Sequence, residues 1–590
     1  MEQFNNILDV INGVIWHNYV LYIVLGVGVL FTLWSGFCQY RALTHGVAVT
    51  RGKYDDPNDP GAINHFQALS AALSATVGLG NIAGVGVAVA LGGPGAVFWM
   101  WMVGIFGMAL KTTEVALSMM YRNTDQPDNP HGGPMYVAAK AFKERGMAGV
   151  GKIVGGIFVV TLLISTITGG NMFQAWSVGE ITENYFQVPS IVCGILLAVL
   201  VGAVIIGGIK RIGAVAGRIV PFMCVLYLLA AGIVLVMNIG IIPEMLKLIV
   251  VQAFSPTEAQ GAFLGGTAGY ALLWGMKRAL FSSESGQGSS PIAHSAAKTD
   301  EPIREAVVAG LEPFIDTLVV CTMTALVILC TGAHIRGPEA TFVDASALAV
   351  QAVDADGDGT QDTNKSDDPL WTVTSSAPSQ RNADAAAIAG PWRGGEDVFI
   401  IVNAGTDDNT GLTLHRMHGE VKMLDTSPSI AWDTDFGSSV APTITSRELY
   451  VDYPGPSLTG HAFDRSIPGL GKYLVTFAAW LFAISTMISW SYYGEQGMVF
   501  LMGEKSVLPY KVIYCLLIVV AAAGFITTDK ELDNLTALGT GVMLWANIPI
   551  MLIFGSVAMR TYHNYFRRLK SGEMEPPHGA RSLSDMQDEE

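Results

Sequence analysis

Ser74-Ala-Thr-Val-Gly-Leu-Gly-Asn81 stands at the centre of the apolar segment 66–101. The segment is long enough to cross a bilayer, since a spanning helix needs roughly 20 apolar residues. Two glycines two residues apart disfavour a continuous helix by up to about 1 kcal/mol each. Unwound backbone survives inside a membrane only where protein or a water-filled cavity satisfies its polar groups. The stretch therefore predicts a helix broken in mid-membrane, and such a break is a candidate binding site.

The two ends of such a break favour opposite charges. The freed N–H groups that begin the second half-helix suit an anion such as a carboxylate, whereas the freed carbonyls that end the first half-helix suit a cation. The alternative is a glycine-rich packing face, because small residues let membrane helices approach closely. We favour packing for four glycines beyond the break: Gly84, Gly86, Gly92 and Gly93.

Composition places the chain in a membrane. Of its 590 residues 51% are hydrophobic and only 14% are charged, well below the roughly 25% charged residues of a soluble domain. The net charge of -16 argues against nucleic acid as a partner. The six cysteines fall in or beside apolar runs without metal-ligand or disulfide spacing, so we interpret them as small core residues. Residues 1–18 contain no Lys or Arg, so a cleavable signal peptide is not expected.

The apolar runs predict an all-α polytopic membrane protein with about eleven spans, near 19–38, 64–91, 95–121, 152–176, 189–209, 213–238, 260–292, 306–332, 471–500, 509–527 and 534–558. Lys and Arg gather in alternate loops, which predicts an outer N-terminus and a cytoplasmic C-terminus. Ten spans remain after the first, as expected for a five-plus-five inverted repeat whose halves each begin with a broken helix.

The second break is predicted from the length of a half-helix. About 10–15 residues at about 1.5 Å each reach the membrane midplane. Counted from Gln260, the break falls at Trp274-Gly-Met276 rather than at Ser285-Gly-Gln-Gly288. Elsewhere, Lys111 and Glu114 lie three residues apart, which predicts a structural ion pair with a snorkelling lysine.

Residues 333–466 differ from the rest of the chain. They contain 20 acidic and 8 basic side chains and short alternating runs such as Asp397-Val-Phe-Ile-Ile-Val402. We expect a small β-rich domain on the outer face. The predicted organisation is therefore a first transporter part at 1–332, this acidic insert at 333–466, a second transporter part at 467–560 and a cytoplasmic tail at 561–590.

The insert contains a possible calcium loop. Asp354, Asp356, Asp358 and Asp362 occupy positions 1, 3, 5 and 9 around a glycine, the spacing of a loop whose oxygens converge on Ca²⁺. Position 12 holds Lys365 instead of glutamate, so a full EF-hand is not expected. An abbreviated calcium loop and a solvated acidic turn both remain open.

A second polar feature lies in the middle of span 471–500. Isolated hydroxyls in a membrane helix usually bond back to their own helix. The adjacent pair Ser485 and Thr486 is a better cation-site candidate, because two hydroxyls and the carbonyls of a broken helix can replace the hydration shell of sodium. Simple packing is the alternative.

Three runs resemble the alanine/glycine:cation symporter family. They are Gly78-Leu-Gly-Asn-Ile-Ala-Gly-Val85, Gly92-Gly-Pro-Gly-Ala-Val-Phe-Trp-Met-Trp101 and Arg278-Ala-Leu-Phe-Ser-Ser-Glu-Ser-Gly-Gln-Gly-Ser-Ser-Pro-Ile-Ala-His294. Thr168-Gly-Gly-Asn-Met-Phe-Gln174 also resembles the family's Gly-Asn-Met-x-Gln motif. The first run is similar to the broken first helix of the sodium-coupled amino-acid transporters typified by the bacterial leucine transporter, which implies that fold.

The resemblance implies two ligand sets. Sodium would be bound by carbonyls of Ser74, Val77 and Phe482 and by the hydroxyls of Ser485 and Thr486. The substrate carboxylate would meet the N–H groups of Gly78, Leu79 and Gly80, and its ammonium the carbonyls near Thr76 and the second break. Asn81 would fix either the loop or the ligand. The other pocket candidates are Phe173, Gln174, Trp274, Gly275, Met276 and Trp490.

The sequence therefore predicts a bacterial inner-membrane transporter, not an enzyme, that couples inward sodium flow to uptake of alanine or glycine by alternating access. No organic cofactor is expected, and the expected partners are the small substrate and the lipid bilayer. Proton coupling is one alternative, but it needs a titratable group at the cation site. The other is an amino-acid receptor, which needs a transducing domain inside the cell.

Overall fold

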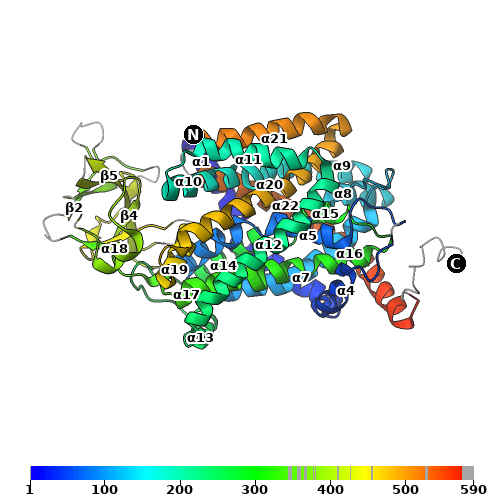
Figure 1. Cartoon of the computed structure of the whole chain (residues 1–590), viewed down its shortest axis with the longest axis horizontal. Coiled ribbons are helices and arrows are strands. Elements are labelled where there is room, and N and C mark those ends of the chain that lie inside the picture. The colour runs from blue at the N-terminus through cyan, green and yellow to red at the C-terminus, as the bar shows by residue number, and fades with distance from the viewer. Residues whose placement is uncertain are drawn as a thin grey trace.

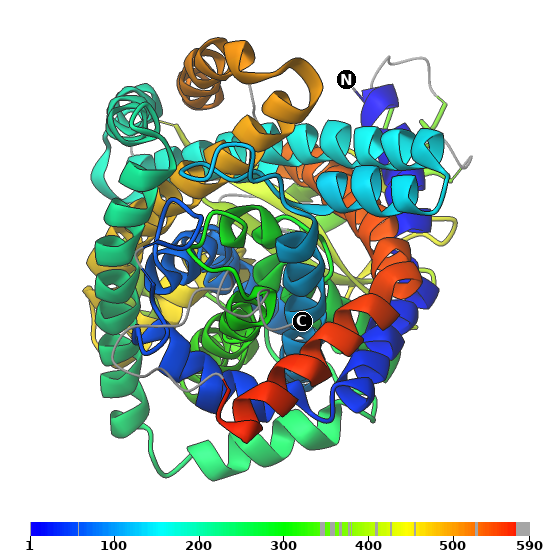
Figure 2. The same cartoon turned by 90° about the vertical axis from the view of Figure 1, so that its right-hand side faces the viewer.

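The computed structural model describes residues 2–573 except 57, 343–347, 355–359, 365–367, 376–377, 379, 408–410, 425–426, 454–455 and 525–528. It is an elongated helical bundle with a β-rich segment at one end, and the C-terminal helix leads away at the other (Figure 1). Looking onto the end away from the β-rich segment, Figure 2 shows the helices near residues 65–76 and 290–309 enclosed by a ring of other helices.

The helices of the first half are α1 (Glu2–Ile15), α2 (Asn18–Trp34), α3 (Cys38–Arg41), η1 (Ala42–Gly46), α4 (Val47–Thr50), α5 (His65–Thr76), η2 (Leu79–Asn81), α6 (Ala83–Gly92), α7 (Gly95–Tyr121), α8 (Pro134–Glu144), α9 (Ala148–Ile167), η3 (Thr168–Met172), α10 (Phe173–Phe186), α11 (Ser190–Ile205), α12 (Gly208–Met237), α13 (Ile242–Gln252), α14 (Ala268–Ser283) and α15 (Ser290–His294). Those of the second half are α16 (Pro302–Ala309), η4 (Phe314–Cys321), α17 (Thr322–Cys330), η5 (Ala333–Ile335), α18 (Ala383–Ala389), α19 (Pro456–Ser466), α20 (Leu470–Met502), η7 (Glu504–Ser506), α21 (Val507–Ala522) and α22 (Asp529–Ser571).

Eight helical stretches among the described residues are long and apolar enough to span a membrane, and a bent pair can form a ninth. Helix α11 is apolar but shorter than these. The chain is thus a multi-pass membrane protein. Helix length and composition do not test the predicted inverted repeat, and they do not confirm the predicted number of eleven spans.

The first break lies where the glycine pattern predicts it. Helix α5 begins at a capping box, in which Asn64 Oδ1 accepts from the Gln67 N–H at 2.8 Å. It ends at Thr76, and Gly78 is extended, with φ -135° and ψ -162°. The chain then continues through η2 and α6 in a direction 62° away from α5. The prediction of a broken helix is confirmed.

The prediction of the second break was wrong in its position. Helix α14 passes through Trp274, Gly275 and Met276 without interruption and ends at Ser283. The count began at Gln260, but the residues before Ala268 form a non-helical turn with an isolated bridge from Thr257 to Gly266. The helix therefore starts later than assumed, and the chain leaves it at the Ser285-Gly-Gln-Gly288 run.

The segment that follows α17 is built from short strands. They are β1 (Ala340–Thr341), β2 (Leu348–Ala352), β3 (Leu370–Ser375), β4 (Asp397–Asn403), β5 (Leu414–Leu424), β6 (Ser427–Trp432), β7 (Phe436–Gly437), β8 (Thr443–Ile444) and β9 (Glu448–Val451). One sheet has the order β1-β9-β4-β5-β6 with β8 on β4, and the other has the order β2-β3-β7. Val398, Ile400 and Val402 of β4 are buried in the core of this segment.

The calcium prediction is not supported. Asp356 and Asp358 lie outside the described residues, whereas Asp354 and Asp362 lie within them. Within the described part of the chain, His, Cys, Asp and Glu side chains form no group that could hold a metal ion.

Helix α19 connects the β-rich segment to the bundle. It packs against α20, α17 and α6. The Thr459 hydroxyl of α19 donates to the Ile82 carbonyl at 3.1 Å, directly beside the first break. The insert thus returns to the bundle at the broken helix.

Candidate functional site

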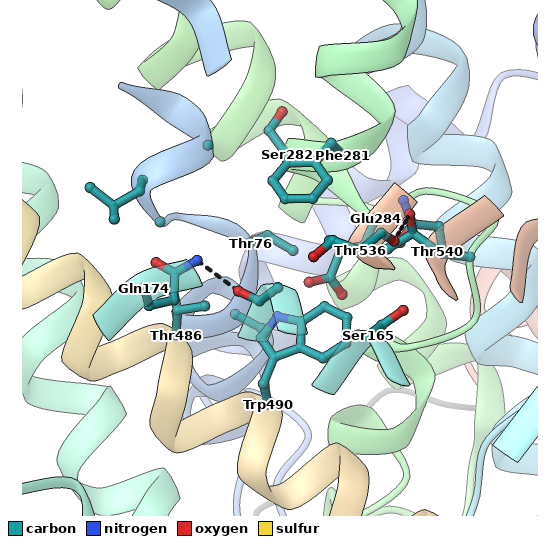
Figure 3. Close-up of a pocket in the computed structure, with 16 residues that line it drawn as sticks. Thr76, Ser165, Gln174, Phe281, Ser282, Glu284, Thr486, Trp490, Thr536 and Thr540 are labelled. Carbon is teal, nitrogen blue, oxygen red and sulfur yellow. Dashed lines mark hydrogen bonds between the residues drawn. The ribbon is translucent and has the colours of Figure 1, made fainter. Parts of the chain in front are cut away.

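A small cavity lies at the first break. The space open to the centre of a water-sized probe is about 30 Å³, which is enough to admit water. Its walls come from α5, η2, α9, η3, α10, α14, the turn after α14, α20 and α22. The sixteen lining residues are Ala75, Thr76, Gly78, Leu79, Gly80, Ser165, Gly169, Gln174, Phe281, Ser282, Glu284, Gln287, Thr486, Trp490, Thr536 and Thr540 (Figure 3).

Backbone N–H groups line one side of the cavity. The N–H groups of Leu79 and Gly80 open the short helix η2, and within the described residues neither donates a hydrogen bond. The Gly78 N–H donates to Asn81 Oδ1 at 2.9 Å. Two unpaired donors at a helix start can bind an anionic group such as a carboxylate.

Asn81 holds the unwound backbone in place. Besides accepting from Gly78, its amide donates to the Asp316 carbonyl at 3.1 Å and to Cys321 Sγ at 3.4 Å. Asn81 does not line the cavity. Of the two roles considered for this residue, the structure favours fixing the loop.

The glycines of the break are needed for close approach. A Cβ at Gly78 would lie 2.7 Å from Thr486 Oγ1, closer than atoms can approach. A Cβ at Gly80 would make only ordinary contact, 3.4 Å from the Phe281 ring. On η3, a Cβ at Gly170 would lie 2.5 Å from Trp490. Gly78 and Gly170 therefore allow α20 to approach the first break and η3 closely.

Polar side chains without partners face the remaining space. Gln174 donates to the Gly169 carbonyl at 3.0 Å, but its Oε1 has no hydrogen-bond partner among the described residues. The same holds for Gln287 Oε1, Ser165 Oγ and Thr486 Oγ1. Glu284 adds a carboxylate to the lining (Figure 3). Ser289 Oγ donates to this carboxylate at 2.5 Å. Buried polar atoms normally have partners, so this set indicates a site for a polar ligand.

Oxygen atoms gather where α5 ends against α20. Ser74 Oγ donates to the Ser485 carbonyl at 2.6 Å, and Ser485 Oγ donates to the Phe482 carbonyl at 2.9 Å. Among the described residues, no N–H donates to the carbonyls of Ser74 or Val77. The Thr486 hydroxyl also has no hydrogen-bond partner among the described residues, and oxygen atoms are the ligands that a hard cation takes.

Six of the predicted substrate residues line the cavity: Thr76, Gly78, Leu79, Gly80, Gln174 and Trp490. Phe173, Trp274, Gly275 and Met276 do not. Gly275 packs against α7, where a Cβ would lie 2.2 Å from the Ala96 carbonyl oxygen. Trp274 instead lies under Lys277 and Arg278, whose charged groups are 5.5 and 5.3 Å from its ring.

The sequence interpretation missed Phe281, Ser282, Glu284 and Gln287 because it placed the break too early in the helix. A signal was present in the run Ser285-Gly-Gln-Gly288. Gly286 and Gly288 have φ of +80° and +84°, a conformation that other residues rarely adopt. The hydroxyls of Ser165, Thr536 and Thr540 were also missed, and they carry no distinguishing local pattern.

Comparison with known proteins identifies one family. The model of the "Sodium:alanine symporter family" matches residues 1–356 and 438–578. The chain is 33% identical over 560 residues to the sodium/alanine symporter AgcS of Methanococcus maripaludis, covering 95% of this chain and 97% of that protein.

Two Bacillus subtilis proteins are similar over a shorter length. The "Amino-acid carrier protein AlsT" is 35% identical over 330 residues, which is 56% of this chain and 68% of the relative. The "Probable sodium/glutamine symporter GlnT" is 36% identical over 335 residues, which is 57% of this chain and 67% of the relative.

Proposed function

The chain belongs to the sodium:alanine symporter family, and from this we propose that it carries a small neutral amino acid into the cell together with sodium. As a member of a symporter family it is a membrane transporter and not an enzyme. The observation that carries the proposal is the cavity at the broken helix, where unpaired N–H groups and unpaired acceptors face one small space.

The amino acid binds across this cavity. Its carboxylate accepts from the N–H groups of Leu79 and Gly80, which have no other acceptor among the described residues. Its ammonium donates to acceptors on the other walls, namely Glu284 and the amide oxygens of Gln174 and Gln287. Charge complementarity of this kind is typical of binding sites for zwitterions.

Sodium binds next to the substrate. Its ligands are the carbonyls of Ser74, Val77 and Phe482 and the hydroxyls of Ser485 and Thr486. Ion binding joins the end of α5 to α20 and so orders the unwound backbone that receives the amino acid. This arrangement links the two binding events through a shared backbone segment.

The size of the cavity favours alanine or glycine. Trp490 and Phe281 are the large side chains of the lining, and both leave room for only a short substrate side chain.

The membrane arrangement follows the same proposal. The two broken helices, α5–α6 and α14–α15, each begin one half of a five-plus-five inverted repeat of the leucine-transporter type. The N-terminus and the segment 333–466 lie outside a bacterial inner membrane, and the C-terminus lies in the cytoplasm.

Equilibrium binding tests the proposal. Purified full-length chain is incubated with radiolabelled alanine in sodium or in choline buffer, with unlabelled glycine and glutamine as competitors. We expect saturable binding that requires sodium and that glycine displaces far better than glutamine. Equal binding in choline would contradict sodium coupling, and displacement by glutamine at least as good as by glycine would contradict the small pocket.

A further inference from the structure

A row of buried ionisable side chains lies on the side of the cavity away from the β-rich segment. Its members come from four parts of the bundle: His65 begins α5, Lys111 lies on α7, His294 ends α15, and Glu305 and Glu312 lie on α16 and just after it. Their side chains are at most 1% exposed. None of them lines the cavity, so substrate binding does not account for them.

The row is continuous. His65 Nδ1 contacts Glu305 Oε2, and Glu305 Oε1 lies 2.5 Å from His294 Nδ1. His294 Nε2 lies 2.6 Å from Glu312 Oε1. Glu312 Oε2 lies 3.3 Å from Lys111 Nζ. Each end of the His294 ring thus faces one carboxylate oxygen within hydrogen-bonding distance.

The two contacts of His294 determine how many protons the row holds. Both ring nitrogens face a carboxylate oxygen, and each contact needs one proton between the two atoms. A neutral imidazole has only one N–H. A second proton therefore resides on the ring or on one of the two carboxyl groups. With this proton, Glu305, His294, Glu312 and Lys111 sum to zero charge, whereas without it the four carry a buried negative charge, which is costly.

Further buried carboxyl groups lie on the neighbouring helices. On α7, Glu114 lies 3.8 Å from Lys111 and accepts from Asn547 of α22 at 2.8 Å. Glu284 after α14 and Asp316 of η4 interact electrostatically with Glu312. When ionised, these carboxyl groups favour a bound proton in the row.

Two further side chains face the same groups. Arg122 at the end of α7 acts on Glu305 as an opposing positive charge, while its guanidinium donates to the carbonyls of Ser295 and Ala297. The phenol of Tyr493 on α20 is buried and interacts electrostatically with Glu284 and Glu312.

The row lies where the first broken helix contacts the helices around it, so movement of α5 would disrupt it. His65 is the first residue of the first broken helix, and His294 is the last residue of α15, the short helix that follows the second break. The row thus joins the starting half of α5 to α15, α16 and α7, at the end of the bundle that Figure 2 shows. Asp55, whose side chain is 39% exposed, lies 3.9 Å from His65 and marks the nearby surface.

We propose that the three central side chains of this row, Glu305, His294 and Glu312, form a proton-binding site, here called the proton row. This site holds closed the path from the cavity to this end of the bundle. That the path carries the amino acid rests on the proposed function, whereas the proton-binding site itself does not. When α5 moves away, Glu305 loses His65 and water reaches the row. The retained proton then leaves. By linkage, a bound proton shifts the equilibrium toward the closed state by the same factor by which closure raises the proton affinity of the site.

Cysteine labelling tests closure without substrate or sodium. The parent is the full chain with Ala68→Cys, one turn along α5 from His65 and fully buried. Alkylation of the peptide containing residue 68 is followed by mass spectrometry from roughly pH 5 to roughly pH 11, because two adjacent carboxyl groups let a histidine keep its proton above its ordinary range. The readout is the labelling rate of the parent divided by that of the same chain carrying His294→Gln. This ratio removes the pH dependence of the thiol's own reactivity, which both chains share.

We expect the parent to label roughly tenfold slower than the His294→Gln chain at low pH, a ratio typical of coupled equilibria, and equally fast at high pH. Glu305→Gln removes one carboxylate with little change in shape and should have the same effect if His294→Gln fails to fold. His334→Gln, a buried histidine in η5 outside the row, should label like the parent.

A ratio that stays constant over the whole pH range, in both variants and in monodisperse protein, would overturn the proposal. Because no alanine is present, this outcome is distinct from a failure of the proposed transport function. Alanine uptake measured at varied pH then reports separately whether the proton row affects the transport rate.

Discussion

Thr486 carries a buried hydroxyl that faces Gly78 and has no hydrogen-bond partner among the described residues. A second hydroxyl of α20, that of Thr476, is equally buried and unpaired, about three turns away. The two residues have the same chemistry and different positions. They therefore form a matched pair for testing the ion site.

Thr486→Val should raise the sodium concentration for half-maximal alanine binding by roughly tenfold, the typical effect of losing one ligand-type contact. The preference for alanine over glutamine should persist, because the walls of the cavity are unchanged. Thr476→Val should leave both quantities as they are. An unaltered sodium requirement in Thr486→Val would remove this hydroxyl from the ion site.

His461 lies outside the spanning helices, at the junction of α19 with the β-rich segment. Its ring stacks on Tyr453 at 4.4 Å. Burial, and then the nearby charges of Arg336, Arg465 and Arg381, lower the pKa of His461 from 6.5 to about 3. The folded state therefore binds fewer protons than the unfolded state between these two values, and stability falls as the pH falls through that window.

Thermal unfolding should show this effect. We expect the melting temperature of the full chain to fall as the pH is lowered from about 6.5 to about 3. In His461→Gln the melting temperature should fall less between these two pH values, because glutamine does not titrate. A fall of the same size in the variant would assign the pH dependence to other groups, such as His334, whose pKa is lowered to about 4 by burial.

At the scale of the helix, the second break is decided by Glu284 and the glycines that follow it. Gln287 belongs to this turn, and its Oε1 faces the cavity without a partner. Trp274 lies more than two turns earlier, on a continuous part of α14. Substitution of these two side chains therefore tests whether alanine binds at the observed break or at the predicted break at Trp274-Gly-Met276.

Gln287→Leu should weaken alanine binding by about 1–3 kcal/mol, the usual effect of losing a buried polar contact, whereas Trp274→Phe should leave the alanine Kd unchanged. The measurement is the binding isotherm at saturating sodium for each variant. Weakened binding in Trp274→Phe with normal binding in Gln287→Leu would show that alanine contacts α14 at Trp274 and not the turn that follows the helix.

The two breaks show what could be predicted from sequence. The first was predictable, because two glycines and the capping residue Asn64 fix both the start of α5 and its end within a short segment. The second was not, because apolar periodicity does not show that residues before Ala268 form a turn. Gly275 was read as part of a break, but its lack of a side chain permits close packing against Ala96.

The ion pair at Lys111 shows a similar limit. Three-residue spacing predicted its contact with Glu114, and the two charged atoms are 3.8 Å apart. The lysine is fully buried and does not snorkel, because Glu312 from a distant part of the chain lies 3.3 Å away. Local spacing predicts a pair within one helix but not a third partner from another.

At the scale of the whole molecule, the β-rich segment and α19 have different relations to the transporter. The strands have a hydrophobic core of their own, whereas α19 packs on α20 and bonds to the broken helix through Thr459. The matched family model omits residues 357–437, which lie among the strands, and resumes before α19.

Deletion of residues 340–452 with a short linker should therefore leave a folded transporter that takes up alanine at a reduced rate. Extension of the deletion to residue 466, which also removes α19, should abolish uptake, because it removes the Thr459 contact and uncovers the break. Both deletions need to be checked for membrane insertion and monodispersity. Equal activity of the two chains would show that α19 does not contribute to the transport path.

Sodium-driven uptake tests the central claim most directly. Full-length chain is reconstituted into proteoliposomes, and radiolabelled alanine is supplied under an inward sodium gradient or an equal choline gradient, with protein-free vesicles as the control. Our account predicts accumulation above the external concentration only under the sodium gradient, abolished by excess glycine. Equal uptake under both gradients, or binding of alanine without any uptake, would contradict it.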